Sequence, residues 1–182
     1  GVTRGDVSLA NSSGVGVFAA EGGSIFVNAK NLDLTSGSSL VAGIGEGLGS
    51  VNAQAGDIII DATESVTLKE TSPVSPSISV IRNIVESGAV GNAGDINITT
   101  TNLALTNGSI ISTTTFGEGN TGNININATE LVALDEINSR LQRASGIYIQ
   151  QTDAVGNEGE LNIVTSNLAL TNGGVISAST LA

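Results

Sequence analysis

Carboxylate side chains recur at a fixed place in this chain, directly after a glycine that precedes each predicted strand. The residues at that place are Asp6, Ser24, Asp57, Asp95, Asn123 and Glu160. Asp57 and Asp95 come from consecutive repeats, so a stacked fold would place their carboxylates on neighbouring strands. Carboxylate oxygens are ligands that Ca²⁺ prefers. The pair is therefore a candidate calcium site, and the alternative is a pair of solvated carboxylates that accept N–H groups of the turns.

Other carboxylates have the residue types that glycoside hydrolysis needs. That reaction uses two carboxyl groups about 5 to 9.5 Å apart, one of them with a raised pKa. Asp61 and Glu64 lie close together in one repeat, and Glu130 is the counterpart of Glu64 in a later repeat. Exposed polar residues at the end of a strand give the same pattern. We therefore predict no catalytic residue and no enzymatic activity.

The long segments between repeats contain residues that could contact a sugar. Arg140 and Arg143 could face one way on a turn and contact an acidic glycan, as a polysaccharide lyase or a glycan-binding surface requires. Tyr148, one of only four aromatic residues, could stack on a sugar ring. The alternative for the arginines is an ordinary solvated loop. These three residues are candidate surface contacts.

Phe26 and Ile59 are predicted to point outward, between two buried apolar neighbours of their own strands. They would form an exposed apolar step, covered either by another segment or by a neighbouring part of the parent protein. Later repeats have asparagine at the same place: Asn97, Asn125 and Asn162. Stacked asparagines form ladders of amide hydrogen bonds that stabilise strands, so we expect a structural role for them.

The strands that must position these residues follow a repeated pattern of glycine, a polar residue and then apolar-x-apolar. The pattern begins at Gly5, Gly23, Gly56, Gly94, Gly122 and Gly159. Alternation with a period of two indicates strands that bury one face. Six such strands in one repeating context predict an all-β solenoid, a single-stranded parallel β-helix with about six rungs. We expect Ile96, Ile124 and Leu161 to form one buried ladder and Ile98, Ile126 and Ile163 to form another, with the glycines at sharp corners.

Two kinds of rung are predicted to alternate. A second strand follows as Leu-x-Leu at Leu103/Leu105, but it is shifted by one residue at Val132/Leu134. The shifted rungs precede two long inter-rung segments, 69–93 and 135–158. Each of these segments is expected to return to a strand, near 78–80 and 146–149, and 135–143 could form a helical turn. We see no domain boundary, so 1–182 is interpreted as one β-helix segment of a longer protein.

Composition excludes several classes of function. The 182 residues contain no cysteine or histidine, so an ordinary zinc or haem site is not expected, and we predict no cofactor apart from the calcium candidate. A net charge of −11 argues against nucleic acid or an anionic membrane as a partner. No apolar run is long enough for a transmembrane helix, so we do not expect membrane insertion.

Several glycine-rich stretches resemble the repeat region of filamentous haemagglutinin-type exoproteins of bacteria. They are GIGEGLGS at 43–50, QAGDI at 54–58, VGNAGDINI at 90–98 and TFGEGNTGNI at 115–124. The resemblance extends over residues 5–180. It implies a right-handed parallel β-helix that is exported by a two-partner secretion system through a dedicated outer-membrane β-barrel, and that often acts as an adhesin.

The resemblance and the repeats together predict a structural and adhesive stalk segment of a secreted or surface-anchored bacterial exoprotein. Its expected partners are the secretion β-barrel of the parent protein and the glycans or surfaces of other cells. The alternatives are a non-catalytic carbohydrate-binding module and, ranked third, a polysaccharide lyase or hydrolase built on a β-helix.

Overall fold

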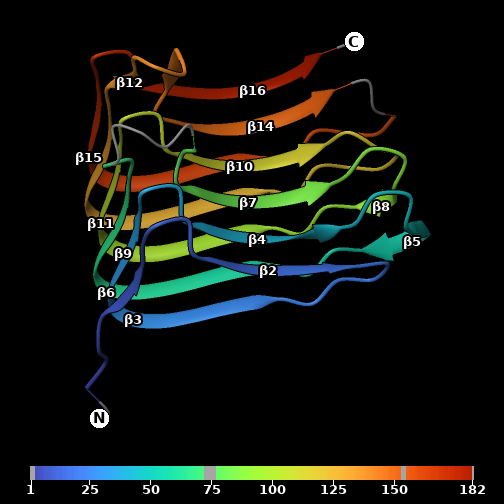
Figure 1. Cartoon of the computed structure of the whole chain (residues 1–182), viewed down its shortest axis with the longest axis horizontal. Helices are drawn as coiled ribbons and strands as arrows, with labels where there is room; N and C mark the ends of the chain where they lie inside the picture. Colours follow the sequence, from blue (N-terminus) through green and yellow to red (C-terminus); the bar gives the residue numbers. More distant parts are fainter. Residues whose placement is uncertain (1–2, 72–76, 153–154, 182) are drawn as a thin grey trace.

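The computed structural model describes residues 3–71, 77–152 and 155–181, and no helix occurs among them. The chain passes alternately through two parallel sheets of six strands, which lie face to face (Figure 1). Sheet A contains β1 (Val7–Leu9), β3 (Ile25–Thr35), β6 (Ile58–Lys69), β9 (Ile96–Thr106), β11 (Ile124–Asp135) and β15 (Leu161–Thr171). Sheet B contains β2 (Gly14–Ala19), β4 (Ser39–Ile44), β7 (Val80–Val85), β10 (Ile110–Thr115), β14 (Gly146–Thr152) and β16 (Val175–Leu181). The strands of both sheets follow chain order, which is the arrangement of a β-helix-like solenoid.

Two small sheets complete the fold. β5 (Gly49–Gln54) pairs in parallel with β8 (Val90–Asn92) beyond the end of sheet B. β12 (Ile137–Asn138) pairs antiparallel with β13 (Arg143–Ala144). The helical turn expected at 135–143 is therefore wrong. This part of the chain forms a short hairpin because Asn138 Oδ1 accepts the N–H groups of Arg140 and Leu141 and closes a turn.

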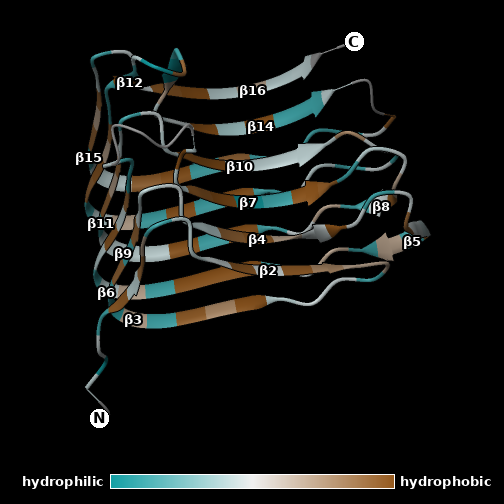
Figure 2. Cartoon of the chain, viewed as in Figure 1, coloured by the Kyte–Doolittle hydropathy of each residue, from teal (hydrophilic) through white to brown (hydrophobic). Residues whose placement is uncertain are grey.

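The core lies between the two sheets and consists of aliphatic columns. The strand register aligns Ile96 with Ile124 and Ile124 with Leu161, and it aligns Ile98, Ile126 and Ile163 in the same way. The register of both predicted ladders is therefore confirmed; their members on β9 and β11 are buried, whereas Leu161 and Ile163 on β15 are partly buried. Figure 2 shows the apolar segments that recur from strand to strand. The period-two pattern gives this result because alternate side chains of a strand point to the same face.

The predicted one-residue shift between repeats is a β-bulge. β6 and β11 each have one residue more than the strands beside them, between Asp61 and Ser65 in β6 and between Ala128 and Leu131 in β11. The extra residue changes the local bend of the strand and leaves the pairing on both sides intact. The two long segments, 69–93 and 135–158, contain β7 and β8 and β12 to β14. Residues 72–76 and 153–154 within them lie outside the described residues.

The glycines that begin each repeat are required for a different reason from the one expected. Gly56, Gly94, Gly122 and Gly159 are not among the residues with positive φ, so no left-handed corner requires them. A Cβ atom on Gly94 would lie 2.3 Å from the carbonyl oxygen of Gly56, and one on Gly159 would lie 2.2 Å from that of Gly122. These glycines therefore allow successive backbones to approach closely.

The predicted asparagine ladder is present on the outer face of sheet A. Asn125 Nδ2 donates to Asn97 Oδ1 (3.0 Å), and Asn162 Nδ2 donates to Asn125 Oδ1 (3.1 Å). The central amide, Asn125, thus donates toward one neighbouring strand and accepts from the other, as a stacked ladder requires.

We predict that Asn125→Leu destabilises the fold by about 1 kcal/mol, because it removes both ladder hydrogen bonds at a partly solvated position. Urea unfolding followed by circular dichroism would measure the change. Asn127→Leu is the matched control, since Asn127 is exposed on the same strand and its side chain is outside the ladder. Equal losses for the two variants would contradict a stabilising role for the ladder.

Candidate binding surfaces

The column of polar residues after the repeat glycines binds one backbone to the next. Ser24 Oγ accepts the N–H of Asp57 (3.1 Å), and Asp57 Oδ1 accepts the N–H of Asp95 (2.8 Å). Asp95 Oδ1 accepts the N–H of Asn123, and Asn123 Oδ1 accepts the N–H of Glu160, both at 2.7 Å. These contacts explain why short side chains with an oxygen acceptor recur there.

Asp57 and Asp95 therefore each have a carboxylate oxygen committed to a structural hydrogen bond. Within residues 3–71, 77–152 and 155–181, no group of three or more histidine, cysteine, aspartate or glutamate side chains could hold a metal ion. A calcium site at this pair stays a prediction from the sequence.

The carboxylates considered for hydrolysis have separate partners. Asp61 forms a salt bridge with Arg4 (2.7 Å), Glu64 forms one with Lys30 (3.4 Å), and Glu130 Oε2 accepts a long hydrogen bond from Asn102 (3.5 Å). The hydrogen bond from Arg4 holds the pKa of the Asp61 carboxyl below its usual value. A general acid needs the opposite shift.

Acid should weaken this protein through Asp61 and Asp135. The pKa of Asp135 is also lowered, by hydrogen bonds from Thr171 and then from Asn172. Because the folded-state pKa of both groups is depressed, their stabilisation is present above the unfolded-state pKa of about 4 and is lost as the pH falls through the folded-state values.

We therefore expect the melting temperature to fall between pH 6 and pH 3, with a smaller fall in the Asp61→Asn/Asp135→Asn double variant. Thermal denaturation across this pH range would measure both curves. An identical fall in the wild type and the double variant would show that the acid sensitivity originates at other groups.

The predicted apolar step lies on the outer face of sheet A, in the same register column as the asparagine ladder. Phe26 pairs with Ile59, and Ile59 pairs with Asn97. Phe26 is 66% exposed, whereas Ile59 is half-buried.

Beside the ladder lies a shallow depression of about 280 Å³, lined by Asn97, Ile98, Thr99, Asn125, Ile126, Asn127, Asn162 and Val164. This surface offers neutral amides next to apolar groups and has no charged residue in its lining.

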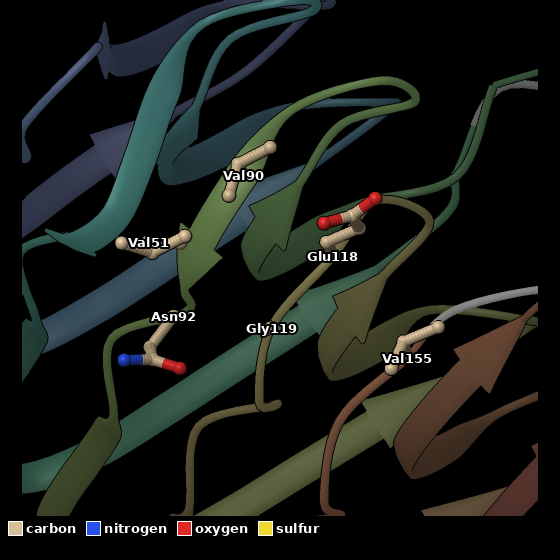
Figure 3. A pocket seen from close by; sticks show the side chains of 7 residues that line it. Val51, Val90, Asn92, Glu118, Gly119 and Val155 are labelled. Carbon is tan, nitrogen blue, oxygen red and sulfur yellow. The ribbon is translucent and has the colours of Figure 1, made fainter.

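A second depression, of about 190 Å³, lies near β5 and β8 (Figure 3). Val90, Glu118 and Val155 are connected there by parallel backbone bridges. Val51 and Val155 are 79% and 77% exposed, and Glu118 is the one charged side chain in the lining. The surface is therefore apolar with a local negative charge, which does not favour an anionic partner.

The outer face of sheet B brings two arginines and a tyrosine together. Arg82 and Tyr148 pair with Ser112 from opposite sides, so the three side chains form one outward column. Arg82 Nε donates to Ser112 Oγ (3.3 Å), and Ser112 is only 2% exposed. Tyr148 reaches residue 144, where its hydroxyl donates to the Ala144 carbonyl (3.5 Å), beside Arg143. We call Arg82, Arg143 and Tyr148 the arginine cluster.

The charges in and near this cluster shift the pKa values of its members. Burial lowers the pKa of the Arg82 guanidinium, the nearby charge of Arg143 lowers it further, and Glu86 acts in the opposite direction. Burial raises the pKa of the Tyr148 hydroxyl, and the charge of Arg143 opposes that shift. The cluster thus combines the half-buried Arg82 and Tyr148 with the exposed Arg143, and Glu86 is its acidic neighbour.

The sequence predicted only part of this cluster. Arg143 and Tyr148 were expected as surface contacts and do lie together. Arg140 lies in the exposed turn between β12 and β13, where its N–H bonds to Asn138 Oδ1 (3.1 Å). Arg82 was missed as a site residue. The pattern that could have identified Arg82 is a buried isoleucine followed by an outward residue in three successive strands. The aligned segments are Val80–Ile81–Arg82, Ile110–Ile111–Ser112 and Gly146–Ile147–Tyr148.

Over the part of the chain that the structure describes, no helix is long and apolar enough to cross a membrane. No protein-family model, no curated protein and no solved structure matches this chain.

Proposed function

We propose that this chain is a structural and adhesive stalk segment of a secreted or surface-anchored bacterial exoprotein of the filamentous haemagglutinin type. In this proposal the solenoid is a right-handed, single-stranded β-helix of about six rungs, with two alternating rung types that correspond to strands with and without the bulge. The stalk extends a contact surface away from the cell.

The observation that supports this proposal is the continuity of side-chain columns along the stack. Aliphatic columns occupy the core, the asparagine ladder lines one outer face, and side-chain acceptors at the corners bind the next backbone. Each column joins neighbouring strands by contacts of the same kind, so the stability of the stack is the sum of similar nearest-neighbour terms. Such a structure suits a rigid spacer better than an enclosed reaction site.

The last strands of the stack are suited to further extension. Leu168 and Leu170 on β15 are 51% and 45% exposed, whereas their register partners Val132 and Leu134 on β11 are fully buried. Another pair of strands on β15 and β16 would cover this apolar surface, in the same way that β15 covers β11.

A second candidate function is that of a non-catalytic carbohydrate-binding module. The arginine cluster favours it, because guanidinium groups recognise acidic sugars and a tyrosine ring stacks on a sugar face. The two functions are compatible if the stalk itself binds the glycan.

A bead assay would test the adhesive role. Beads coated with the purified chain would be passed over intact cells and over neutral and acidic polysaccharides, and the soluble phase would be assayed for new reducing ends and unsaturated products. We expect retention without product. Beads coated with Ile98→Asp, a variant that we expect to be unfolded, are the control for nonspecific attachment.

The two contrary results differ in meaning. Product release would replace adhesion with an enzymatic function. Retention no greater than that of the unfolded control would show that this segment is not itself adhesive.

A further inference from the structure

Four of the six basic residues of this acidic chain fall into two groups with different surroundings. Arg4 and Lys30, next to sheet A, form salt bridges with Asp61 and Glu64. Arg82 and Arg143, on the other side, form no salt bridge with any described residue. With seventeen acidic residues and six basic ones, the chain has enough carboxylates to neutralise every cation. Two adjacent arginines without such a partner therefore require an explanation.

Of these two arginines, Arg82 has the less favourable surroundings for its charge. Its guanidinium is half-buried, has a like charge nearby, and donates a hydrogen bond from Nε to Ser112 Oγ on the neighbouring strand β10. A cation removed from water without a counter-ion costs free energy. The terminal N–H groups of Arg82 are suited to a planar anionic acceptor such as a carboxylate, which a guanidinium binds through two parallel hydrogen bonds.

Tyr148 gives this site a second kind of contact. A Cβ atom on Gly146 would lie 2.4 to 2.5 Å from the ring and hydroxyl of Tyr148, so the ring lies across Gly146 against the outer face of the sheet. The hydroxyl end of the ring thus lies over the Gly146 backbone, and the ring is held in place beside Arg143. An aromatic ring held beside the Arg143 guanidinium matches a sugar ring that has an acidic substituent.

We propose that the arginine cluster binds the carboxylate of a uronate residue in a short acidic oligosaccharide, with Arg82 and Arg143 holding the carboxylate and Tyr148 contacting the sugar ring. The net charge of −11 limits the ligand, because a densely charged polyanion would be repelled by the rest of the surface. An isolated uronate carboxylate avoids that repulsion. The proposal deepens the adhesive function and rests on it for the biological partner, while binding itself is measurable on the purified chain.

The test is calorimetric titration of the folded chain with a tetrasaccharide of one galacturonate residue and three neutral sugars, in the presence of a chelator so that no Ca²⁺ can bridge. The matched ligand is the same tetrasaccharide with its one carboxyl group methyl-esterified. Arg82→Gln and Arg143→Gln should each weaken binding about tenfold, the value of one charge-assisted hydrogen bond. Tyr148→Leu, which still covers Gly146, should weaken it about fivefold.

Two further variants separate a specific site from general charge. Lys30→Gln makes the same charge change on the opposite side and should leave the affinity unchanged. Glu86→Gln removes the acidic neighbour of Arg82 and should tighten binding about threefold. Arg82→Gln should fold with a melting temperature no lower than that of the wild type, since it removes a half-buried cation. Arg143 is exposed, so its variant tests the site even if Arg82→Gln fails to fold.

Several outcomes would overturn the proposal: no binding of the tetrasaccharide, equal binding of the methyl ester, or equal loss in Lys30→Gln. Tighter binding of a sulfated oligosaccharide or of an acidic peptide of equal charge would overturn the uronate assignment. The bead assay separates this inference from the adhesive function. If beads coated with the Arg82→Gln/Arg143→Gln double variant are retained as well as wild-type beads, adhesion does not depend on the arginine cluster. If the purified chain binds the tetrasaccharide but wild-type beads are not retained, the cluster binds the sugar and the segment is not adhesive.

Discussion

Ile98→Asp is expected to abolish the cooperative unfolding transition of this protein. Ile98 is 1% exposed, and its neighbours in the core column are Ile60 and Ile126, which are also buried. An aspartate there would place a carboxylate among aliphatic side chains with no cation in the column. Burial of an unpaired charge costs more than about 4 kcal/mol, which is comparable with the whole stability of a small domain.

The neighbouring residue provides the control. Asn97 points to the opposite face, and its Oδ1 accepts the Asn125 amide. Asn97→Asp keeps that acceptor and introduces the same side chain as Ile98→Asp, so we expect a change below about 0.5 kcal/mol. Circular dichroism during thermal denaturation would compare the two. Similar melting temperatures would contradict the assignment of Ile98 to the buried face of β9 and of Asn97 to its outer face.

Gly122→Ala is expected to have the second largest effect. A Cβ atom on Gly122 would lie 1.9 Å from the carbonyl oxygen of Gly94, well inside contact distance. β11 and β9 are hydrogen-bonded from Ile124↔Ile96 onward, so the backbones cannot separate at Gly122 without weakening this pairing. We expect a loss of about 3 kcal/mol, at the upper end of the cost of overpacking.

Gly5→Ala is the matched control for this prediction. Gly5 begins the first repeat, yet nothing lies within 4 Å of a Cβ atom built on it, and its φ is not positive. Alanine there should change the free energy of unfolding by less than about 0.5 kcal/mol. Urea denaturation of both variants would measure the difference. Equal effects would mean that close approach between successive backbones does not explain the repeat glycines.

Much of the architecture could be predicted because it depends on local periodicity. The alternation of Ile96, Asn97 and Ile98 determines which side chains are buried, since successive residues of a strand point to opposite faces. Repetition of that pattern at Ile124 and Leu161 then predicted the register that the sheets have. The asparagine ladder followed from the same rule, because residues in register on stacked strands must be neighbours.

The contacts between repeats could not be predicted in this way. The sequence suggested sharp corners at the glycines, whereas close packing of Gly122 on Gly94 requires them. The sequence did not indicate that Oδ1 of Asp57 and of Asp95 accepts an N–H group of the next repeat. Such roles depend on distances of a few ångström between segments about thirty residues apart, and no local pattern contains those distances.

The arginine cluster is the clearest case of what tertiary structure alone decided. Arg82 and Tyr148 are far apart in the chain and lie in segments of different length, so their spacing gives no sign of contact. Only the pairing of β7, β10 and β14 places them on either side of Ser112. The sequence by itself determined which residues face inward, through the two-residue period of the strand. The stacking of strands decided which outward residues meet, because it sets the register between segments of unequal length.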